Sequence, residues 1–259
     1  MIIYKTDKEI KAIKKSNQIV AKILRELQSM VKPGIKTEEL DSYAEARTKE
    51  MKAVPAFKGY HGYPASLCAS VNEEIVHGIP GSRILREGDI ISLDFGVVYD
   101  GFYGDAALTC PVGRISKEAQ KLISAVEEAF HRGLEQVREG NRISDVSFAI
   151  QRNVESKGFS VIRSFVGHGI GFYLHEEPQI PNFGSAGHGL RIKKGMVLAI
   201  EPMISSGDWR VEILPNEWTA ITKDRTLSAH YEHTVAVTSS GVEILSLLES
   251  NSVKESNYA

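Results

Sequence analysis

Apolar residues recur at three- and four-residue spacing near the start of the chain, which predicts an amphipathic helix. Thr6 and Glu9 have the spacing of a capping box, so the helix is expected to begin just after Thr6. Pro33 and Gly34 are expected to end it. The apolar stripe consists of Ile10, Ile13, Val20, Leu24, Leu27 and Val31.

Three further helices follow from the same kind of pattern. Thr37, Ser116 and Ser144 each precede an apolar periodic segment and are interpreted as helix caps. These helices are expected to end near Met51, Gly140 and Gly158, and the chain beyond the last one is expected to form short strands separated by Gly and Pro. The pattern therefore predicts an α/β protein.

Short strands are predicted before and between these helices. Residues 67–72 are interpreted as a strand within a segment rich in Gly, Pro and aromatic residues. Residues 90–99 and 102–109 flank Asp100-Gly101, a two-residue turn signal, and predict a β-hairpin.

The hairpin turn fixes which residues face each other. With Asp100-Gly101 as the turn, Asp94 pairs with Ala107, and Gly96 pairs with Asp105. Asp94 and Asp105 are then diagonal neighbours on one face, roughly 7–8 Å apart at the backbone. We expect their carboxylates to converge, and we expect Gly96 to leave space opposite Asp105.

The chain also shows signs of an internal duplication. One offset of 107 residues relates Thr37 to Ser144, His61 to His168, Gly88 to Gly195, and residues 88–94 to residues 195–201. The interpretation is one catalytic domain over residues 1–259, built from pseudo-two-fold half-units of residues 1–110 and 111–248, with a polar tail at residues 249–259. The alternative is chance similarity between amphipathic segments.

Composition narrows the class of protein. The 259 residues include 42% hydrophobic and 25% charged residues, which are ordinary globular values. The formal charge of −2 argues against binding to DNA. Two cysteines fit a reducing compartment, and the sequence has neither a signal peptide nor a run of roughly 18 apolar residues, so we expect a cytoplasmic protein without a membrane partner.

Five residues carry candidate metal chemistry: Asp94, Asp105, His168, Glu201 and Glu232. Taken alone, each acid is more often a surface or ion-paired carboxylate. However, Asp94 and Glu201 lie in apolar strand segments without Lys or Arg, at positions related by the duplication. Buried carboxylates need neutralisation. Four carboxylates and one imidazole suit two divalent ions such as manganese, iron, cobalt or zinc.

Several motifs occur in one order along nearly the whole chain: VNEEIVHGIPG (71–81), ISLDFG (91–96), YGDAA (103–107), GHGIG (167–171), HEEPQIPN (175–182), AIEPM (199–203) and SAHYEHT (228–234). Together they resemble the type I methionine aminopeptidases of the M24 metallopeptidases. The resemblance implies the pita-bread fold, with a curved and mostly antiparallel sheet. It also implies removal of the initiator methionine from nascent polypeptides by a hydrolase with a dinuclear metal centre.

The resemblance assigns a role to each motif residue. Asp94 resembles the ligand that chelates one ion, Asp105 and Glu232 resemble the bridging carboxylates, and His168 and Glu201 hold the other ion. Glu201 would also move a proton. His77 and His175 resemble the two histidines of the substrate cleft that are not metal ligands, with His175 stabilising developing negative charge.

The methionine pocket of the family is apolar and aromatic, and by position it would comprise Phe57, Tyr60, Tyr63, Cys68, Leu174 and Trp218. Ordinary core packing is the alternative for each of them. Leu174 stands where many relatives place an aromatic residue, and Phe57 stands where small residues are common. Cys68 is not expected to be a nucleophile. His131 and His188 are interpreted as surface residues, while His61 and His233 receive no role.

Two rival classes remain. Aminopeptidase P and prolidase carry a large extra N-terminal domain, and a helix that starts at Thr6 leaves no room for one. A non-catalytic binding protein of this fold would have lost metal ligands, and all five are present. We expect a monomer that prefers a small second residue in its substrate. Transient ribosome contact through Lys8, Lys11, Lys14 and Lys15 is an alternative to a simple solvated helix face.

Overall fold

The computed structural model describes residues 1–248, and the tail expected at residues 249–259 lies outside this range. The helices are α1 (Asp7–Met30), α2 (Thr37–Glu50), α3 (Lys117–Leu134) and α4 (Ile143–Ser156), with a 3-10 turn η1 (Tyr60–Gly62). Among the described residues, no helix is both long enough and apolar enough to cross a membrane.

Within residues 1–248, nine strands form the main sheet. They are β1 (Val54–Pro55), β2 (Cys68–Val71), β4 (Ile90–Tyr99), β5 (Phe102–Pro111), β7 (Val166–Gly169), β8 (Glu176–Pro181), β9 (Val197–Ile200), β14 (Glu232–Thr238) and β15 (Gly241–Ile244). Its central order is β1-β4-β5-β14-β9-β7-β8, and β2 and β15 add to β4 and β14. Within the described residues, all strand pairings of this sheet are antiparallel, in agreement with the expected fold class.

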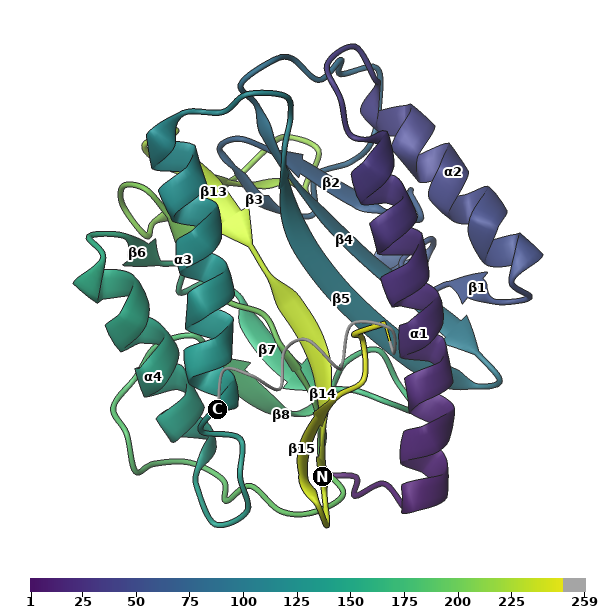
Figure 1. Ribbon diagram of the computed structural model, residues 1–259, viewed down its shortest axis with the longest axis vertical. Helices are drawn as coiled ribbons and strands as arrows, with labels where there is room; N and C mark the ends of the chain where they lie inside the picture. Colours follow the sequence, from purple (N-terminus) through teal and green to yellow (C-terminus); the bar gives the residue numbers. More distant parts are fainter. Residues whose placement is uncertain (249–259) are drawn as a thin grey trace.

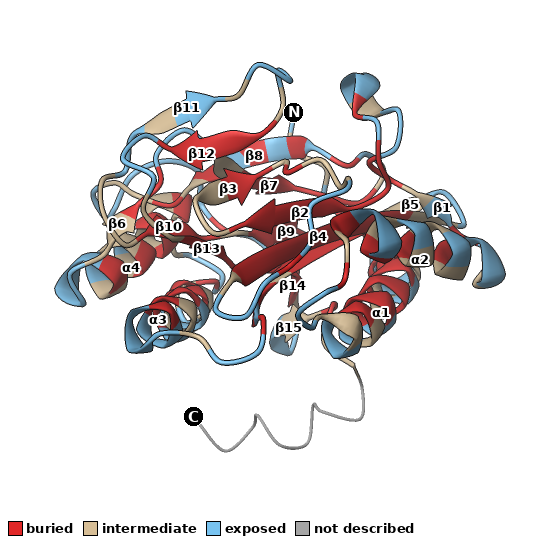
Figure 2. Ribbon diagram, turned by 90° about the horizontal axis from the view of Figure 1, so that it is seen from above, coloured by how far each residue is buried: buried red, intermediate tan, exposed pale blue. Residues whose placement is uncertain are grey.

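Two smaller three-stranded sheets complete the fold. Their strands are β3 (Glu74–Val76), β6 (Ser160–Val161), β10 (Met203–Ser205), β11 (Val211–Ile213), β12 (Ala220–Thr222) and β13 (Ser228–His230). Figure 2 shows the four helices along one side of the main sheet and β3, β11 and β12 on the other side. The helices thus cover one face of the sheet and leave the other free to form a cavity.

The β4–β5 hairpin has the predicted register. Asp94 pairs with Ala107, and Gly96 pairs with Asp105. Gly96 also makes room for Phe57, because a Cβ atom at Gly96 would lie 2.8 Å from Cε1 of Phe57.

Helix ends were predicted less accurately than helix positions. Thr6 makes the predicted capping box with Glu9, and Ser116 caps α3. The N-caps of α2 and α4 are instead Lys36 and Arg142, because the side chains of their N3 residues, Glu39 and Asp145, accept hydrogen bonds from the cap amides. Helix α3 ends at Leu134 rather than near Gly140. The predicted helix was too long because Val137 is buried without being helical, so the apolar pattern continues beyond the end of the helix.

The hydroxyls of Thr37 and Ser144 have another use that reveals the duplication. Thr37 Oγ1 donates to the carbonyl of Gly81 and accepts from its amide, at 3.0 and 2.9 Å. Ser144 Oγ makes the same two bonds to His188, both at 2.7 Å. The partners, like the hydroxyl residues, differ by the 107-residue offset. One landmark fails, since His61 lies in η1 whereas His168 lies on β7.

Figure 1 shows α1 and α2 together over one part of the main sheet and α3 and α4 together over another. Each pair of helices has its own apolar cluster beneath it. Under α1 and α2, Leu24, Leu40 and Leu93 are buried in one cluster. Under α3 and α4, Phe130 and Leu198 belong to another. β4, which carries Asp94, is therefore packed mainly against one pair of helices, and β9, which Glu201 follows, is packed against the other pair.

Candidate metal centre and substrate cavity

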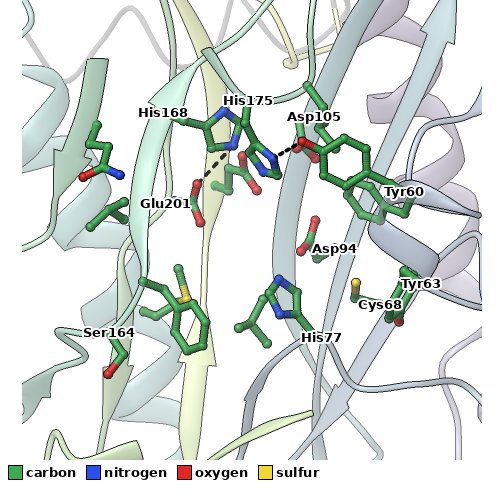
Figure 3. Close-up of a pocket in the computed structure, with 18 of the residues that line it drawn as sticks. Tyr60, Tyr63, Cys68, His77, Asp94, Asp105, Ser164, His168, His175 and Glu201 are labelled. Atoms are coloured by element: carbon green, nitrogen blue, oxygen red, sulfur yellow. Dashed lines mark hydrogen bonds and ion pairs between the residues drawn. The ribbon is translucent and has the colours of Figure 1, made fainter. Parts of the chain in front are cut away.

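A cavity of about 500 Å³ opens on the face of the sheet away from the helices. Its lining includes all the residues that the sequence singled out for the site: Phe57, Tyr60, Tyr63, Cys68, His77, Asp94, Asp105, His168, Leu174, His175, Glu201, Trp218 and Glu232. Figure 3 shows the acidic and imidazole groups pointing toward one another from different strands. No lysine or arginine is found among the described residues that line it.

Strand register brings the acids together. Asp94 on β4 and Glu232 at the start of β14 both pair with Ala107 of β5, so they flank one backbone position from opposite sides. Asp105 lies two residues before Ala107 on the same face of β5. Glu201 directly follows β9, whose Ala199 faces His168 on β7. The five candidate ligands thus come from five strands or strand ends.

The carboxyl groups lack ordinary partners. Asp94 Oδ1, Asp105 Oδ1 and Glu232 Oε1 are buried without a hydrogen bond. Burial raises the pKa of Asp94 to about 7. Burial first, and then the neighbouring carboxylates, raise the pKa of Asp105, Glu201 and Glu232 well above their usual values. Without added positive charge the site would hold protons at neutral pH.

His168 is arranged as a neutral ligand. Its Nδ1 lies 2.9 Å from the carbonyl oxygen of Gly169, which can only accept, so Nδ1 carries the proton. Burial, followed by the neighbouring His175, lowers the pKa of His168 to about 3. Nε2 therefore presents a lone pair, and it faces Glu201 Oε1 at 3.3 Å. Two acceptors at this distance need a proton or a cation between them.

These observations fit a divalent metal site. Ligand atoms of Asp105, His168 and Glu232 all lie within 4.8 Å of one another. Asp94 and Glu201 are outside that group of three but line the same cavity. Carboxylate and imidazole donors without thiolate suit manganese, iron, cobalt or zinc. The donor set and its unpartnered oxygens thus match what such ions require.

The two cleft histidines occupy different places. Tyr60 Oη lies 2.8 Å from His175 Nδ1, and the rings of His175 and His168 meet edge to face at 4.4 Å. Burial, mainly, raises the pKa of Tyr60, so its hydroxyl keeps its proton. His77 packs edge-on against Phe165, and burial lowers the pKa of His77 to about 4. Both histidines are neutral at pH 7, because burial also lowers the pKa of His175.

One end of the cavity is apolar. Phe57, Tyr63, Cys68 and Leu174 are buried in one cluster, and Trp218 packs against it. The hydroxyl of Tyr63 donates to backbone carbonyl groups of Leu67 and Gly78, so only its ring faces the cavity. Burial raises the pKa of the Cys68 thiol well above its usual value, which argues against a nucleophilic thiolate.

Sequence reasoning missed several lining residues. Phe165 packs against His77, and Met203 lines the same cavity. Phe165 lies two residues before GHGIG, and Met203 is the last residue of AIEPM, and both motifs were used for their polar members only. His230, in the third position of SAHYEHT, is fully buried with both ring nitrogens unpartnered, and its Nε2 lies 3.9 Å from Glu232 Oε2. Its place within a quoted motif was the available signal.

The remaining histidines are not among the described residues that line the cavity. His233 bonds Ser246 Oγ through Nδ1 and the Tyr231 hydroxyl through Nε2. The ring of His61 packs against Tyr60. His131 and His188 are exposed, as expected.

Comparisons with known proteins agree with this geometry. Residues 11–239 match the model of metallopeptidase family M24. Methionine aminopeptidase 1 of Bacillus subtilis is 50% identical over 245 residues, covering 95% of this chain and 99% of that protein. Methionine aminopeptidase of Clostridium perfringens is 51% identical over 249 residues, covering 96% and 100%.

Solved structures give the same result. Methionine aminopeptidase from Thermotoga maritima has 46% identity and a TM-score of 0.94, covering 95% of this chain and 100% of that one. The prolidase from Pyrococcus horikoshii shares the fold at 22% identity, with a TM-score of 0.78 and 64% of that chain covered. The chain therefore belongs to metallopeptidase family M24 and, within it, to the methionine aminopeptidases.

Proposed function

We propose that this cavity hydrolyses the first peptide bond of chains that begin with methionine followed by a small residue, and that it does so with two divalent ions. Removal of N-terminal methionine by a metal-dependent hydrolase is the activity of its family. The observation that carries the finer proposal is the meeting of four carboxyl groups, three of which have a buried oxygen without a hydrogen-bond partner, and one neutral imidazole beside an apolar pocket. Four negative charges match two divalent cations.

The residues would share the ions in a defined way. We propose that Asp94 would be a ligand of one ion, and that His168 and Glu201 would be ligands of the other. Asp105 and Glu232 would be ligands of both ions. Ions in such a site supply Lewis-acid activation of water and of the peptide carbonyl. The family resemblance suggests these roles, and the convergence of the side chains supports them.

The chain's own groups would handle the protons. Tyr60 can donate its hydroxyl proton to His175 Nδ1, which leaves an Nε2–H group free to donate to the carbonyl oxygen as it gains negative charge. Glu201 would take a proton from the attacking water and deliver it to the leaving nitrogen.

Specificity would come from two neighbouring parts of the cavity. The apolar part, with Phe57, Tyr63, Cys68, Leu174 and Trp218, would take the unbranched methionine side chain. Beside Trp218, the rings of His77 and Phe165 pack edge to face and would leave space only for a small second residue. Action as a cytoplasmic monomer on nascent chains remains a prediction, as does transient ribosome contact.

The test is turnover of short peptides by metal-stripped protein to which a single metal is returned. Met-Ala-Ser is expected to release methionine, with activity saturating at two equivalents. Met-Lys and Leu-Ala peptides should be poor substrates. Asp105→Asn removes the negative charge of a proposed shared ligand, so the variant should lose metal occupancy. Its turnover should fall by more than about a hundredfold, which exceeds the loss expected when a residue that only hydrogen-bonds to a metal ligand is changed. Normal occupancy in that variant would refute the ligand assignment, and release of residues other than methionine from X-Pro peptides would favour the prolidase type.

A further inference from the structure

A buried ion pair lies at the edge of the site, where Glu176 is one of the residues that line the cavity. Lys5, just before α1, pairs its ammonium group with Glu176 Oε2, and their side chains are 1% and 2% exposed. Glu176 directly follows His175 in sequence. Paired charges this deeply buried are costly to assemble, so their placement invites a reason other than stability.

Glu176 holds the backbone turn that precedes His175. Its other oxygen, Oε1, accepts hydrogen bonds from the amides of Phe172 and Tyr173, at 2.7 and 3.1 Å. The turn is tied to the hairpin as well, because the Tyr103 amide donates to the Gly171 carbonyl at 2.8 Å. One carboxylate therefore clamps the turn that joins β7, with His168, to His175.

Lys5 is itself fixed in place. Its amide donates to the carbonyl of Gly195 at 2.7 Å. Two glycines make room for it: a Cβ atom at Gly171 would lie 2.7 Å from Lys5 Cε, and one at Gly195 would lie 2.9 Å from the Lys5 carbonyl oxygen. Gly171 and Gly195 have φ values of +152° and +87°. The backbone bond to Gly195 and the close packing against Gly171 thus fix the position of the Lys5 ammonium group beside Glu176.

We propose that Lys5 and Glu176 are positioning residues that hold the 171–176 turn, so that His175 points its ring at the carbonyl oxygen of the substrate. The proposal rests on the proposed role of His175. Tyr60 fixes the ring from one side through Nδ1, whereas Glu176 fixes the backbone from which the ring extends. A misplacement of about 1 Å at such a donor can cost on the order of a hundredfold in rate.

Two double variants separate positioning from charge. Lys5→Met with Glu176→Gln removes both charges but keeps a carbonyl oxygen for the two turn amides. Lys5→Met with Glu176→Leu removes the charges and that oxygen as well. We expect the Gln pair to retain kcat within about threefold. We expect the Leu pair to lose roughly ten- to a hundredfold in kcat on Met-Ala-Ser, with a smaller change in KM.

The decisive measurement repeats the Leu pair in a His175→Ala background. If the pair acts through His175, the loss there should shrink to within about twofold, and manganese affinity measured by calorimetry should be unchanged. An equal loss in both backgrounds, or normal kcat in the Leu pair, would overturn the proposal. Normal kcat in His175→Ala alone would instead refute the proposed role of His175, so the two failures are distinguishable.

Two further variants serve as controls. Lys157→Met with Glu128→Leu makes the same two kinds of substitution in a more exposed ion pair, between the C-cap of α4 and helix α3; neither residue lines the cavity, so kcat should be unchanged. If the Leu pair does not fold, Gly171→Ala perturbs the same contact through the added Cβ atom. It should lower kcat in the wild-type background and not in His175→Ala, and equal losses in the two backgrounds would overturn the proposal.

Discussion

At the scale of single residues, protonation separates the groups that hold metal from those that handle substrate. His168 has its Nδ1 proton engaged by its neighbour's carbonyl and keeps Nε2 as a lone pair. His175 has the opposite arrangement if Tyr60 donates to its Nδ1, because Nε2 then carries the proton. Two neutral imidazoles whose ring centroids are 4.4 Å apart can therefore have different roles, with His168 as a metal ligand and His175 as a hydrogen-bond donor.

This difference leads to a prediction for the two histidines. His168→Ala should weaken metal binding, with activity partly recovered by excess metal. His175→Ala should leave metal affinity near normal and lower kcat by about 10²–10³, as expected for the loss of one oxyanion donor. Calorimetric titration of metal and turnover at saturating metal check both variants. The opposite pattern would mean that the two roles are reversed.

The acids give a second prediction at this scale. A carboxyl whose folded pKa is raised is stabilising below its unfolded pKa, near 4, and that stability is lost as pH rises through the folded pKa. For Asp94 the folded pKa is about 7, and for Asp105 it is well above the usual value. The histidines with lowered pKa act oppositely, but only below about pH 6.5.

In chelator, the melting temperature should therefore fall as pH rises from 6.5 to 8. Asp105→Asn removes one of the mutually repelling carboxyl groups, so the decrease in melting temperature over this pH range should be smaller by several degrees. Thermal unfolding of both proteins across this range is the measurement. Equal slopes in the two proteins would show that Asp105 is not protonated in the metal-free fold.

At the scale of elements, the hairpin was predictable because its turn is local. Asp100-Gly101 sets the register, and the register alone puts Asp94 and Asp105 on one face. Helix caps were less predictable, since Thr37 and Ser144 use their hydroxyls on distant loops rather than on helix amides. His230 lies only two residues from Glu232, but its burial depends on the long-range pairing of β13 with β10, which local sequence does not encode.

The crossing of α1 over β5 gives an element-scale prediction. A Cβ atom at Gly104 would lie 2.7 Å from the Asn17 backbone nitrogen and 2.8 Å from the Ser16 carbonyl carbon. Because both obstacles are backbone, Gly104→Ala should force the helix away and destabilise the fold by about 1–3 kcal/mol. Denaturant unfolding measures the loss. Gly81→Ala is the matched control, since nothing lies within 4 Å of its Cβ position, and equal stability of the two variants would contradict the close crossing.

At the scale of the whole molecule, the site joins two separately packed halves. Asp94 and Asp105 come from strands backed by α1 and α2, whereas Glu201 and Glu232 come from the region backed by α3 and α4. Ions bound between them would act as cross-links that only the folded chain can make. Metal binding should therefore stabilise the entire fold and not merely order a loop.

The expected gain follows from linkage. Metal at about a hundred times its Kd adds roughly 2.7 kcal/mol. For a chain of this size, each kcal/mol raises Tm by about 2–4 °C. Addition of manganese or cobalt to the stripped protein should then raise Tm by about 5–11 °C in a single cooperative transition, and Asp105→Asn should lose most of that rise. Calorimetric unfolding with and without metal checks this. Two separate transitions, of which only one responds to metal, would mean that the ions bind within one half and do not link the two.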